Sequence, residues 1–178
     1  MIAGTYKGRV LQTPPGRSTR PTGDRVKEAI FSMIGPYFSQ QSCLDVFAGS
    51  GALGIEALSR GVQRAVFVDK ASGSVIHNNL ASLNASDRAV VIRSTYKQAF
   101  DRLKEQGEVF DLVFADPPYQ AQLLDKCLHS LVELSLLAPF SLVVAEMPSE
   151  LATPVVPRLT LWKEAVYGIA KIGIYRFT

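Results

Sequence analysis

The stretch CLDVFAGSGALGIEAL, residues 43–58, carries the strongest fold signal in the chain. A run over residues 43–47 that is apolar except for Asp45 precedes the letters GSGALG, which satisfy the pattern G-x-G-x-x-G. Apolar residues at helical spacing follow. Glycine permits a tight turn and a close backbone approach, and a helix start offers free N–H groups to a ligand. The stretch therefore predicts the first βα unit of a nucleotide-binding fold.

The rest of the chain repeats this alternation of strand and helix. We expect strands over residues 43–47, 65–68, 89–92, 109–115 and 141–146, and helices over 52–60, 72–83, 96–105 and 122–134. Short apolar strands separated by helices of this length indicate a parallel sheet with helices on both faces. The last twenty or so residues, LTLWKEAVYGIAKIGIYRFT, predict an antiparallel hairpin around Gly168. Together these elements predict a Rossmann-like, seven-stranded, mostly parallel sheet.

The N-terminal part differs from this core. Residues 1–12 predict a short β-hairpin with glycines at 4 and 8, and RPTGDRVKEAIFSMI predicts a helix with Thr22 as its N-cap. Residues 1–30 carry a net charge of +4 in a chain whose total is +3, so the remainder carries −1. This basic segment indicates a contact with a polyanion, or else a solvated, flexible arm. We expect one domain, 1–178, with an N-terminal extension (1–40) on a catalytic core (41–178).

Composition excludes several classes of protein. The chain has 178 residues, 47% of them hydrophobic, and no apolar run approaches the ~18–20 residues of a membrane span. Two cysteines and two histidines give little material for a disulfide framework or a metal site. The N-terminus resembles no secretory signal, so we expect a cytoplasmic protein without a metal or a membrane contact.

Two acids identify the expected ligand more closely. Asp69 closes the second strand 20 residues after Gly49, where a carboxylate can bind a ribose diol. Asp45 lies inside the first strand, where a dinucleotide-binding fold normally has apolar side chains. A carboxylate there can face the α-amino group of S-adenosylmethionine, a cation that NAD lacks. Alternatively, Asp45 is a polar strand-end residue that accepts hydrogen bonds from the loop's own N–H groups.

The stretch FADPPYQ, Phe114–Gln120, ends the fourth strand in a stiff corner. In a doubly wound sheet this tip lies next to the glycine loop. Pro117 and Pro118 have fixed φ and no N–H, so their carbonyls are held rigidly. The Asp116 carboxylate and the Pro117 carbonyl are two acceptors for the two N–H groups of a nucleobase amine, and Tyr119 is an aromatic ring on which the base can stack. A plain strand-ending turn is the alternative.

In this order the motifs resemble the class I S-adenosylmethionine-dependent amino-methyltransferases. The letters IAGTYKGRVL and RPTGDRVKEAIFSMI narrow the resemblance to the RsmD-type 16S rRNA (guanine-N2)-methyltransferases, over nearly the whole chain. The resemblance implies catalytic roles for Asp116, Pro117, Pro118 and Tyr119. It implies a cofactor site of Asp45, Phe47, Ala48, Gly49, Ser50, Gly51, Asp69, Lys70, Thr95, Tyr96 and Asp116. It implies RNA contacts by Lys7, Arg9, Arg20, Thr22, Arg25 and Lys27. The implied partner is 16S rRNA or the assembling small subunit, bound by a monomer.

Two positions and one loop depart from the family pattern, and the loop, Arg17–Arg20, is filled differently from that of many relatives. Thr95 stands after the third strand, where relatives often carry an Asp or Asn that binds adenine, and Ser32 stands where relatives often carry Asn. Three other functions remain open at this point. A DNA adenine-N6 methyltransferase would normally need a target-recognition domain for which the chain has no room. An NAD-dependent oxidoreductase would need a hydride-transfer residue that we do not find. A non-catalytic RNA-binding module would not need Asp45, Asp69 and D-P-P-Y together.

Overall fold

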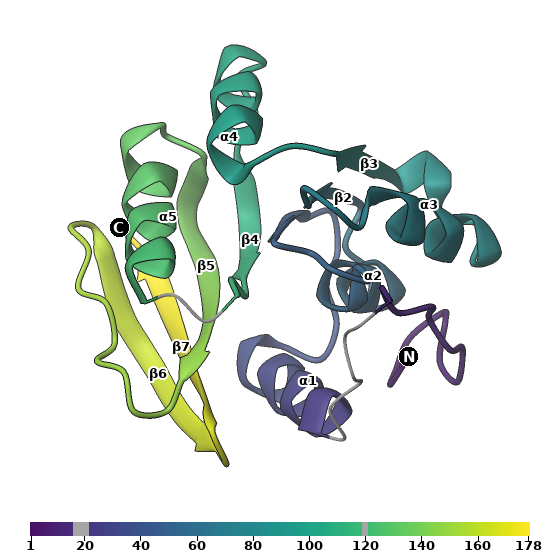
Figure 1. Cartoon of the computed structure of the whole chain (residues 1–178), viewed down its shortest axis with the longest axis horizontal. Helices are drawn as coiled ribbons and strands as arrows, with labels where there is room; N and C mark the ends of the chain where they lie inside the picture. Colours follow the sequence, from purple (N-terminus) through teal and green to yellow (C-terminus); the bar gives the residue numbers. More distant parts are fainter. Residues whose placement is uncertain (16–21, 119–120) are drawn as a thin grey trace.

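A seven-stranded sheet forms the centre of the molecule in the computed structural model, which describes residues 1–15, 22–118 and 121–178 (Figure 1). The strands are β1 (Ser42–Val46), β2 (Arg64–Val68), β3 (Ala89–Ile92), β4 (Phe110–Ala115), β5 (Leu137–Pro148), β6 (Leu159–Tyr167) and β7 (Ala170–Phe177). Their order is β3-β2-β1-β4-β5-β7-β6. The first five pair in parallel, and β7 pairs antiparallel with both β5 and β6. The predicted sheet and its C-terminal hairpin are confirmed.

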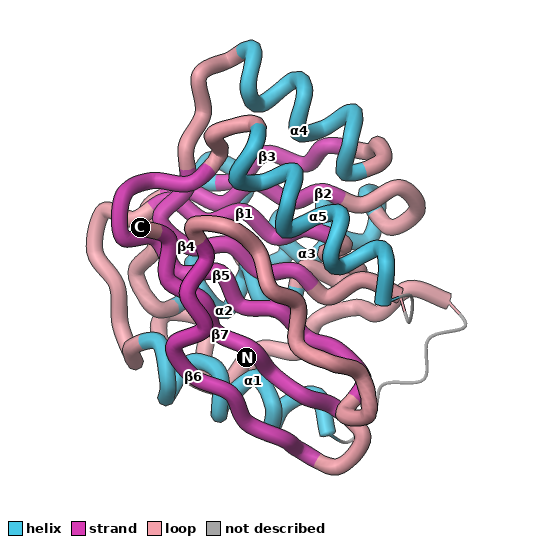
Figure 2. The backbone as a smooth tube through the Cα atoms, turned by 90° about the vertical axis from the view of Figure 1, so that its left-hand side faces the viewer, coloured by secondary structure: helices cyan, strands magenta, loops and turns pink. Residues whose placement is uncertain are grey.

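Helices cover both faces of the sheet (Figure 2). They are α1 (Thr22–Ile34), α2 (Ala52–Ser59), α3 (Gly73–Ser82), α4 (Tyr96–Glu105) and α5 (Ala121–Glu133), with a 3-10 turn, η1 (Ser86–Arg88), before β3. Two separate apolar clusters reflect the two faces, because successive strand residues point to opposite sides. Cys43, Phe67 and Phe114 pack with α1, α2 and α3, whereas Leu44 and Val113 pack with α4 and α5. None of the helices in the described part of the chain is long and apolar enough to cross a membrane.

The predicted N-terminal β-hairpin is wrong. Residues 1–15 form bends, turns and irregular chain without a strand. The backbone of this segment is bonded to helix α2 in place of a strand partner. The N–H groups of Ile2 and Ala3 donate to the Glu56 carboxylate, at 3.0 and 2.9 Å, and Tyr6 N–H donates to the Ser59 hydroxyl at 2.9 Å. A short glycine-containing segment can satisfy its polar groups this way without a sheet.

Glycine is required at position 4 by this docking. A Cβ there would lie 1.8 Å from the Ser59 carbonyl oxygen, and φ is +76°. Both facts exclude other residues, because a side chain would clash with backbone and strain the left-handed conformation. The segment is therefore held against α2 as part of the body of the protein.

One expected strand is longer than the sequence indicated. The prediction placed it at 141–146, but β5 runs over Leu137–Pro148. Its register to β4 shifts between Phe110 and Leu112, and Phe140 has φ +63° with its side chain exposed. This irregularity lets the chain continue as strand past Pro139, which a regular pattern would not allow.

Candidate active site

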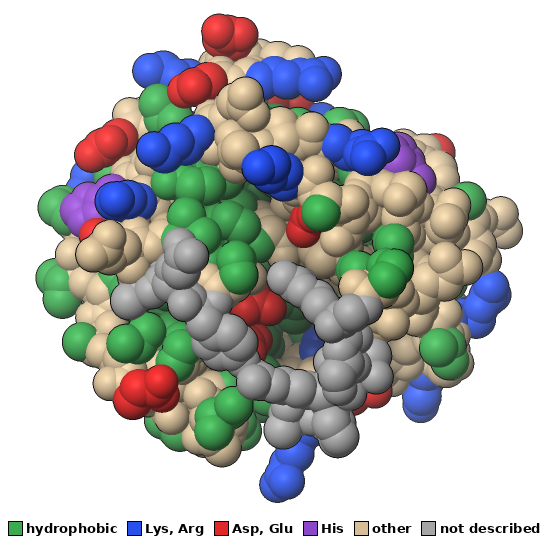
Figure 3. All heavy atoms as spheres, viewed as in Figure 1, with side chains coloured by type: hydrophobic (Ala, Val, Ile, Leu, Met, Phe, Trp, Pro, Cys, Tyr) green, Lys and Arg blue, Asp and Glu red, His purple; other side chains and the backbone are tan. Residues whose placement is uncertain are grey.

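The ends of β1 and β4 meet at one pocket. These two strands are paired in parallel, with Asp45 opposite Phe114 and Val46 opposite Ala115. The pocket has a volume of about 160 Å³ and is lined by Thr13, Pro14, Asp45, Phe47, Ala48, Gly49, Ser50, Ala52, Leu53 and Asp116. Figure 3 shows acidic side chains inside a hollow on this face. Most of the predicted cofactor loop and the first predicted catalytic acid are thus brought together.

The glycine loop makes its turn with three left-handed residues. Phe47 has φ +61°, Gly49 +58° and Gly51 +80°. Ala48 N–H donates to the Val68 carbonyl at 3.1 Å, and Gly51 N–H donates to the Ala48 carbonyl at 2.8 Å. A phenylalanine in the left-handed region is costly, and such residues concentrate at ligand sites. Together with its place in the pocket lining, the conformation of Phe47 supports a binding role for the loop.

The third glycine allows helix α2 to lie directly on the sheet. A Cβ at Gly54 would lie 2.5 Å from the Phe67 ring and 3.0 Å from Asp45 Oδ2. Gly54 N–H donates to Asp45 Oδ2 at 2.8 Å. Asp45 is thus bonded to the start of α2, as the structural alternative predicted, and it also lines the pocket.

The pKa of Asp45 is raised to about 8. Burial is the largest cause, the Gly54 N–H bond opposes it, and the nearby charges of Asp116 and Asp69 raise it further. A buried carboxylate among other acids keeps its proton until a positive charge arrives. The site therefore favours a cation next to Asp45.

Asp69 supports the loop from the second strand. Its Oδ2 accepts from Gly49 N–H at 2.9 Å, and its Oδ1 accepts from the N–H groups of Ala71 and Ser72, at 2.9 and 2.7 Å. An ionised carboxylate has about four acceptor positions, so these three bonds use most of them. Asp69 therefore fixes the turn after β2. Lys70, the next residue, is exposed.

The corner after β4 is open to the outside. Asp116 and Pro118 are exposed, Pro117 is half-buried, and Asp116 reaches the pocket. Tyr119, the predicted stacking ring, lies outside the described residues. The corner therefore presents a carboxylate beside the glycine loop, as the adjacency of β4 and β1 led us to expect.

Thr95 and Tyr96 lie after β3 and serve the fold. The Thr95 hydroxyl accepts from Gln98 N–H, and the Gln98 side chain accepts from Thr95 N–H, so the two residues form a capping box at the start of α4. The Tyr96 side chain is buried and its ring lies 5.7 Å from the Phe47 ring. Burial raises the pKa of its phenol. Tyr96 supports the pocket wall through Phe47 and does not line the pocket itself.

The predicted RNA-binding cations divide into two groups. Lys7 and Arg25 are exposed, as is Arg9, whose guanidinium also donates to the Ser82 carbonyl at 2.7 Å. Lys27 is a correction: its ammonium is buried and pairs with Asp24 at 3.3 Å and Glu56 at 3.8 Å. Lys27 points inward toward Glu56, which is fully buried and is also paired with Arg60 at 2.8 Å. Arg20 lies outside the described residues, as does the side chain of Thr22.

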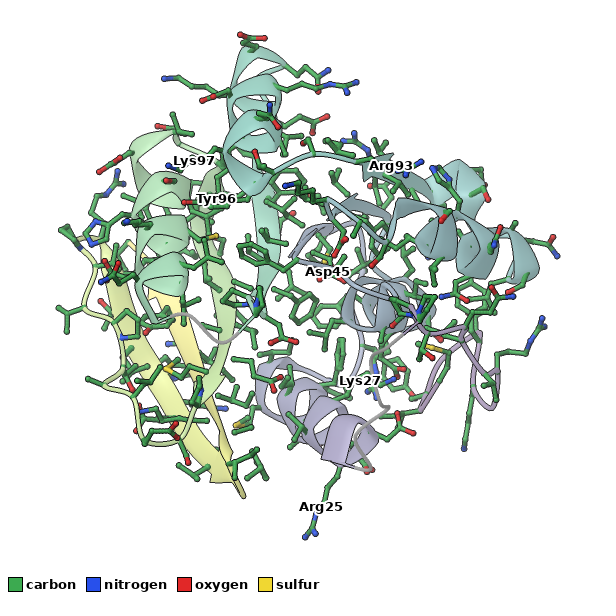
Figure 4. All side chains as sticks on the ribbon, in the orientation of Figure 1. Arg25, Lys27, Asp45, Arg93, Tyr96 and Lys97 are labelled. Atoms are coloured by element: carbon green, nitrogen blue, oxygen red, sulfur yellow. The ribbon has the colours of Figure 1, made fainter. Side chains whose placement is uncertain are left out.

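Sequence reasoning missed other residues near the pocket. Thr13, Pro14, Ala52 and Leu53 line it. Figure 4 shows Arg93 and Lys97 on the side of the molecule opposite Arg25, and both are exposed. Neither of these two cations is among the residues that line the pocket. No pattern in the sequence pointed to Thr13 and Pro14, since only the docking of the N-terminal segment brings them there.

The fold is that of a Rossmann-like methyltransferase. An RNA methyltransferase from Salinibacter ruber, solved in complex with S-adenosyl-L-homocysteine, matches with a TM-score of 0.68 at 14% identity, covering 89% of this chain and 94% of that chain. A hypothetical protein from Thermus thermophilus matches with a TM-score of 0.82 at 30% identity, covering 97% of this chain and 96% of that one.

Sequence comparison identifies the family. The model of the family described as "Conserved hypothetical protein 95" matches residues 1–176. The chain is 37% identical over 180 residues to the ribosomal RNA small subunit methyltransferase D of Haemophilus influenzae, covering 99% of this chain and 92% of the relative. The chain belongs to the "Conserved hypothetical protein 95" family, as the resemblance of its motifs predicted.

Proposed function

We propose that this protein methylates the exocyclic N2 amine of a guanine in small-subunit 16S rRNA, with S-adenosylmethionine as methyl donor. Family membership and the name of the Haemophilus relative support the reaction and the substrate. One structural observation carries the chemistry: Asp45 and Asp116, from neighbouring strands, line the same pocket as the glycine loop. One acid is buried and suited to a cation, and the other is exposed and suited to the incoming base.

The pocket residues fit the cofactor. Asp45, with its raised pKa, would accept a hydrogen bond from the α-amino group and become ionised beside it. Gly49, Ser50 and Gly51 leave room for close backbone approach. Asp69 would reach the ribose through its remaining acceptor capacity. S-adenosylmethionine supplies an electrophilic methyl carbon on a sulfonium sulfur.

The chain's contribution to the transfer is positioning. The Asp116 carboxylate and the Pro117 carbonyl would accept the two N–H bonds of the guanine amine, which turns its lone pair toward the methyl carbon. The amine nitrogen would bond to the methyl carbon as the C–S bond breaks and its electron pair stays on sulfur, and the proton displaced from the amine would pass to the Asp116 carboxylate or to water. Alignment of this kind supplies much of the rate enhancement in such transfers and needs no covalent enzyme intermediate. Tyr119 would stack on the base.

The exposed cations support RNA as the substrate. Lys7, Arg9 and Arg25 would contact phosphates, a salt-dependent contribution that is independent of sequence. We further propose a monomeric, cytoplasmic enzyme that acts as one domain over 1–178, with 16S rRNA or the assembling small subunit as its partner.

Methyl transfer is tested with labelled S-adenosylmethionine. The protein is incubated separately with free 16S rRNA, assembled small subunits, DNA, and each of these without enzyme. Label at a guanine N2 of 16S rRNA, in either RNA form, supports the proposal. Label found only in DNA would overturn it in favour of an adenine methyltransferase, and binding of NADH without methyl transfer would overturn it in favour of an oxidoreductase.

A further inference from the structure

Asn79 on helix α3 is a buried amide with three hydrogen bonds to two other segments. Its side chain is almost fully buried, with 1% of the residue exposed. Its Oδ1 accepts from Gln12 N–H at 2.7 Å, and its Nδ2 donates to the Gln12 carbonyl at 2.9 Å. The same Nδ2 donates to the Ser50 carbonyl at 2.9 Å. One side chain therefore bonds both backbone groups of Gln12 and one of Ser50.

Both bonded segments form walls of the pocket. Ser50 belongs to the glycine loop and lines the pocket. Gln12 is followed directly by Thr13 and Pro14, which line it from the N-terminal segment. Figure 1 shows this segment beside α2 and α3, far in sequence from both. Asn79 thus links the pocket wall formed by the N-terminal segment to the wall formed by the glycine loop.

The chemistry of the side chain explains why an amide serves here. A side-chain amide accepts at its oxygen and donates at its nitrogen from one planar group, as both backbone groups of Gln12 require. A carboxylate at this position could not donate to Gln12 and Ser50, and an apolar residue would leave polar groups without partners. A buried donor or acceptor without a partner costs about 1–3 kcal/mol.

We propose that Asn79 is a positioning residue for the cofactor pocket, and that Thr13 and Pro14, which follow Gln12, belong to the cofactor-binding site. The proposal rests on the function proposed above, because it assigns the pocket to S-adenosylmethionine. In this proposal the N-terminal segment closes one side of the pocket, in addition to the RNA contact expected from its charge.

The chain offers a matched control for the test. Asn78 is the same residue type, adjacent on the same helix and exposed. Asn79→Leu, which keeps the approximate volume without hydrogen bonds, is compared with Asn78→Leu and the wild type. Binding of S-adenosylmethionine is measured by titration calorimetry, kcat is measured at saturating cofactor, and amide hydrogen exchange is followed at residues 11–13.

The expected result separates positioning from general stability. Loss of the bonds should weaken cofactor binding by about ten-fold, the equivalent of about 1.4 kcal/mol. We expect kcat at saturation to change less than about three-fold, because Asn79 does not contact the reacting atoms, and exchange at residues 11–13 to rise. A folded Asn79→Leu variant with wild-type affinity and exchange would overturn the inference, as would an equal loss in Asn78→Leu.

A second variant keeps the test decisive if Asn79→Leu does not fold. Gln12 is exposed and lies outside the core. Gln12→Pro removes the N–H that donates to Asn79 Oδ1, and Gln12→Ala, the control, keeps that N–H. Weaker cofactor binding in Gln12→Pro alone supports the inference, and equal binding in both overturns it. A wild-type chain that binds no S-adenosylmethionine would instead overturn the proposed function, while hydrogen exchange would still decide whether Asn79 holds the segment.

Discussion

The glycine loop after β1 and the corner after β4 lie at the same pocket but are built in opposite ways. The loop and its acids are bonded within the chain: Asp45 accepts from Gly54 N–H, and Asp69 accepts from three backbone N–H groups. The corner holds its shape through consecutive prolines, and its acid is exposed. The chain thus shapes the cofactor loop in advance and leaves the corner facing the substrate.

This difference predicts which measurement each residue will affect. A residue whose polar atoms bond within the chain should affect stability when it is replaced, and cofactor binding through the shape of the loop. A residue that faces outward should affect turnover or substrate binding with little effect on stability. Each substitution below tests this division.

The largest effect is expected for Asp116→Ala. Removal of the carboxylate leaves the guanine amine without one of its two acceptors, and misalignment of a reacting group costs about 100-fold or more in rate. We expect methyl transfer to 16S rRNA to fall by at least about that factor. Because Asp116 is exposed, the melting temperature should change less than it does in a variant of the buried loop residues. A variant that retains turnover would remove Asp116 from the mechanism, and one that fails to fold would break the proposed division.

The next largest effect is expected for Gly54→Ala in the loop. The new Cβ would press against the Phe67 ring, and overpacking of this kind costs about 1–3 kcal/mol. Urea unfolding should show the loss, and cofactor binding should weaken as α2 moves from Asp45. Gly23→Ala is the control, because a Cβ there has no neighbour within 4 Å and φ is not left-handed. Equal stability of the two variants would show that α2 does not need its close approach.

Much of this site could be predicted from the sequence because its signals are local. Gly54 and Asp116 lie in short motifs whose positions relative to a strand end are set by the parallel fold. The position of Gln12 beside Asn79 could not be predicted, since it depends on how a segment without periodicity docks on α2 and α3. Lys27 was misassigned for a related reason. Its charge was visible in the sequence, but its partner Glu56 comes from another helix.

Asp45→Asn should separate the two tasks of the buried acid. The amide oxygen can still accept from Gly54 N–H, but no charge forms. Since the pKa of Asp45 is about 8, well above its ordinary value of 3.8, ionisation on cofactor binding releases a proton. Wild-type affinity should therefore rise by up to about ten-fold per pH unit from pH 6 toward pH 8. Calorimetry on Asp45→Asn should give weaker binding with a flat profile, and an equal slope in both proteins would contradict the assignment.

The same acid predicts how stability depends on pH without cofactor. A carboxyl group with a higher pKa in the folded state than in the unfolded state binds its proton more tightly when folded. Its contribution is fully present below about pH 4 and is lost as pH rises toward 8. Thermal unfolding of the wild type should lose stability relative to Asp45→Asn over that range. Asp45 therefore favours ligand binding and lowers the stability of the cofactor-free protein as the pH rises toward 8.

The smallest effects are expected on α1, where two basic residues repeat the contrast between loop and corner. Arg25 is exposed, so Arg25→Ala should weaken RNA binding a few-fold and lower the salt dependence by about one unit of slope, with an unchanged melting temperature. Lys27 is bonded inward to Asp24 and Glu56, so Lys27→Met should cost roughly 1 kcal/mol of stability and leave the salt slope unchanged. Filter binding across a salt series, with thermal unfolding beside it, measures both. A reversed pattern would mean that Lys27 leaves its buried partners to meet the RNA, and burial would then be a poor guide to which basic residues contact the substrate.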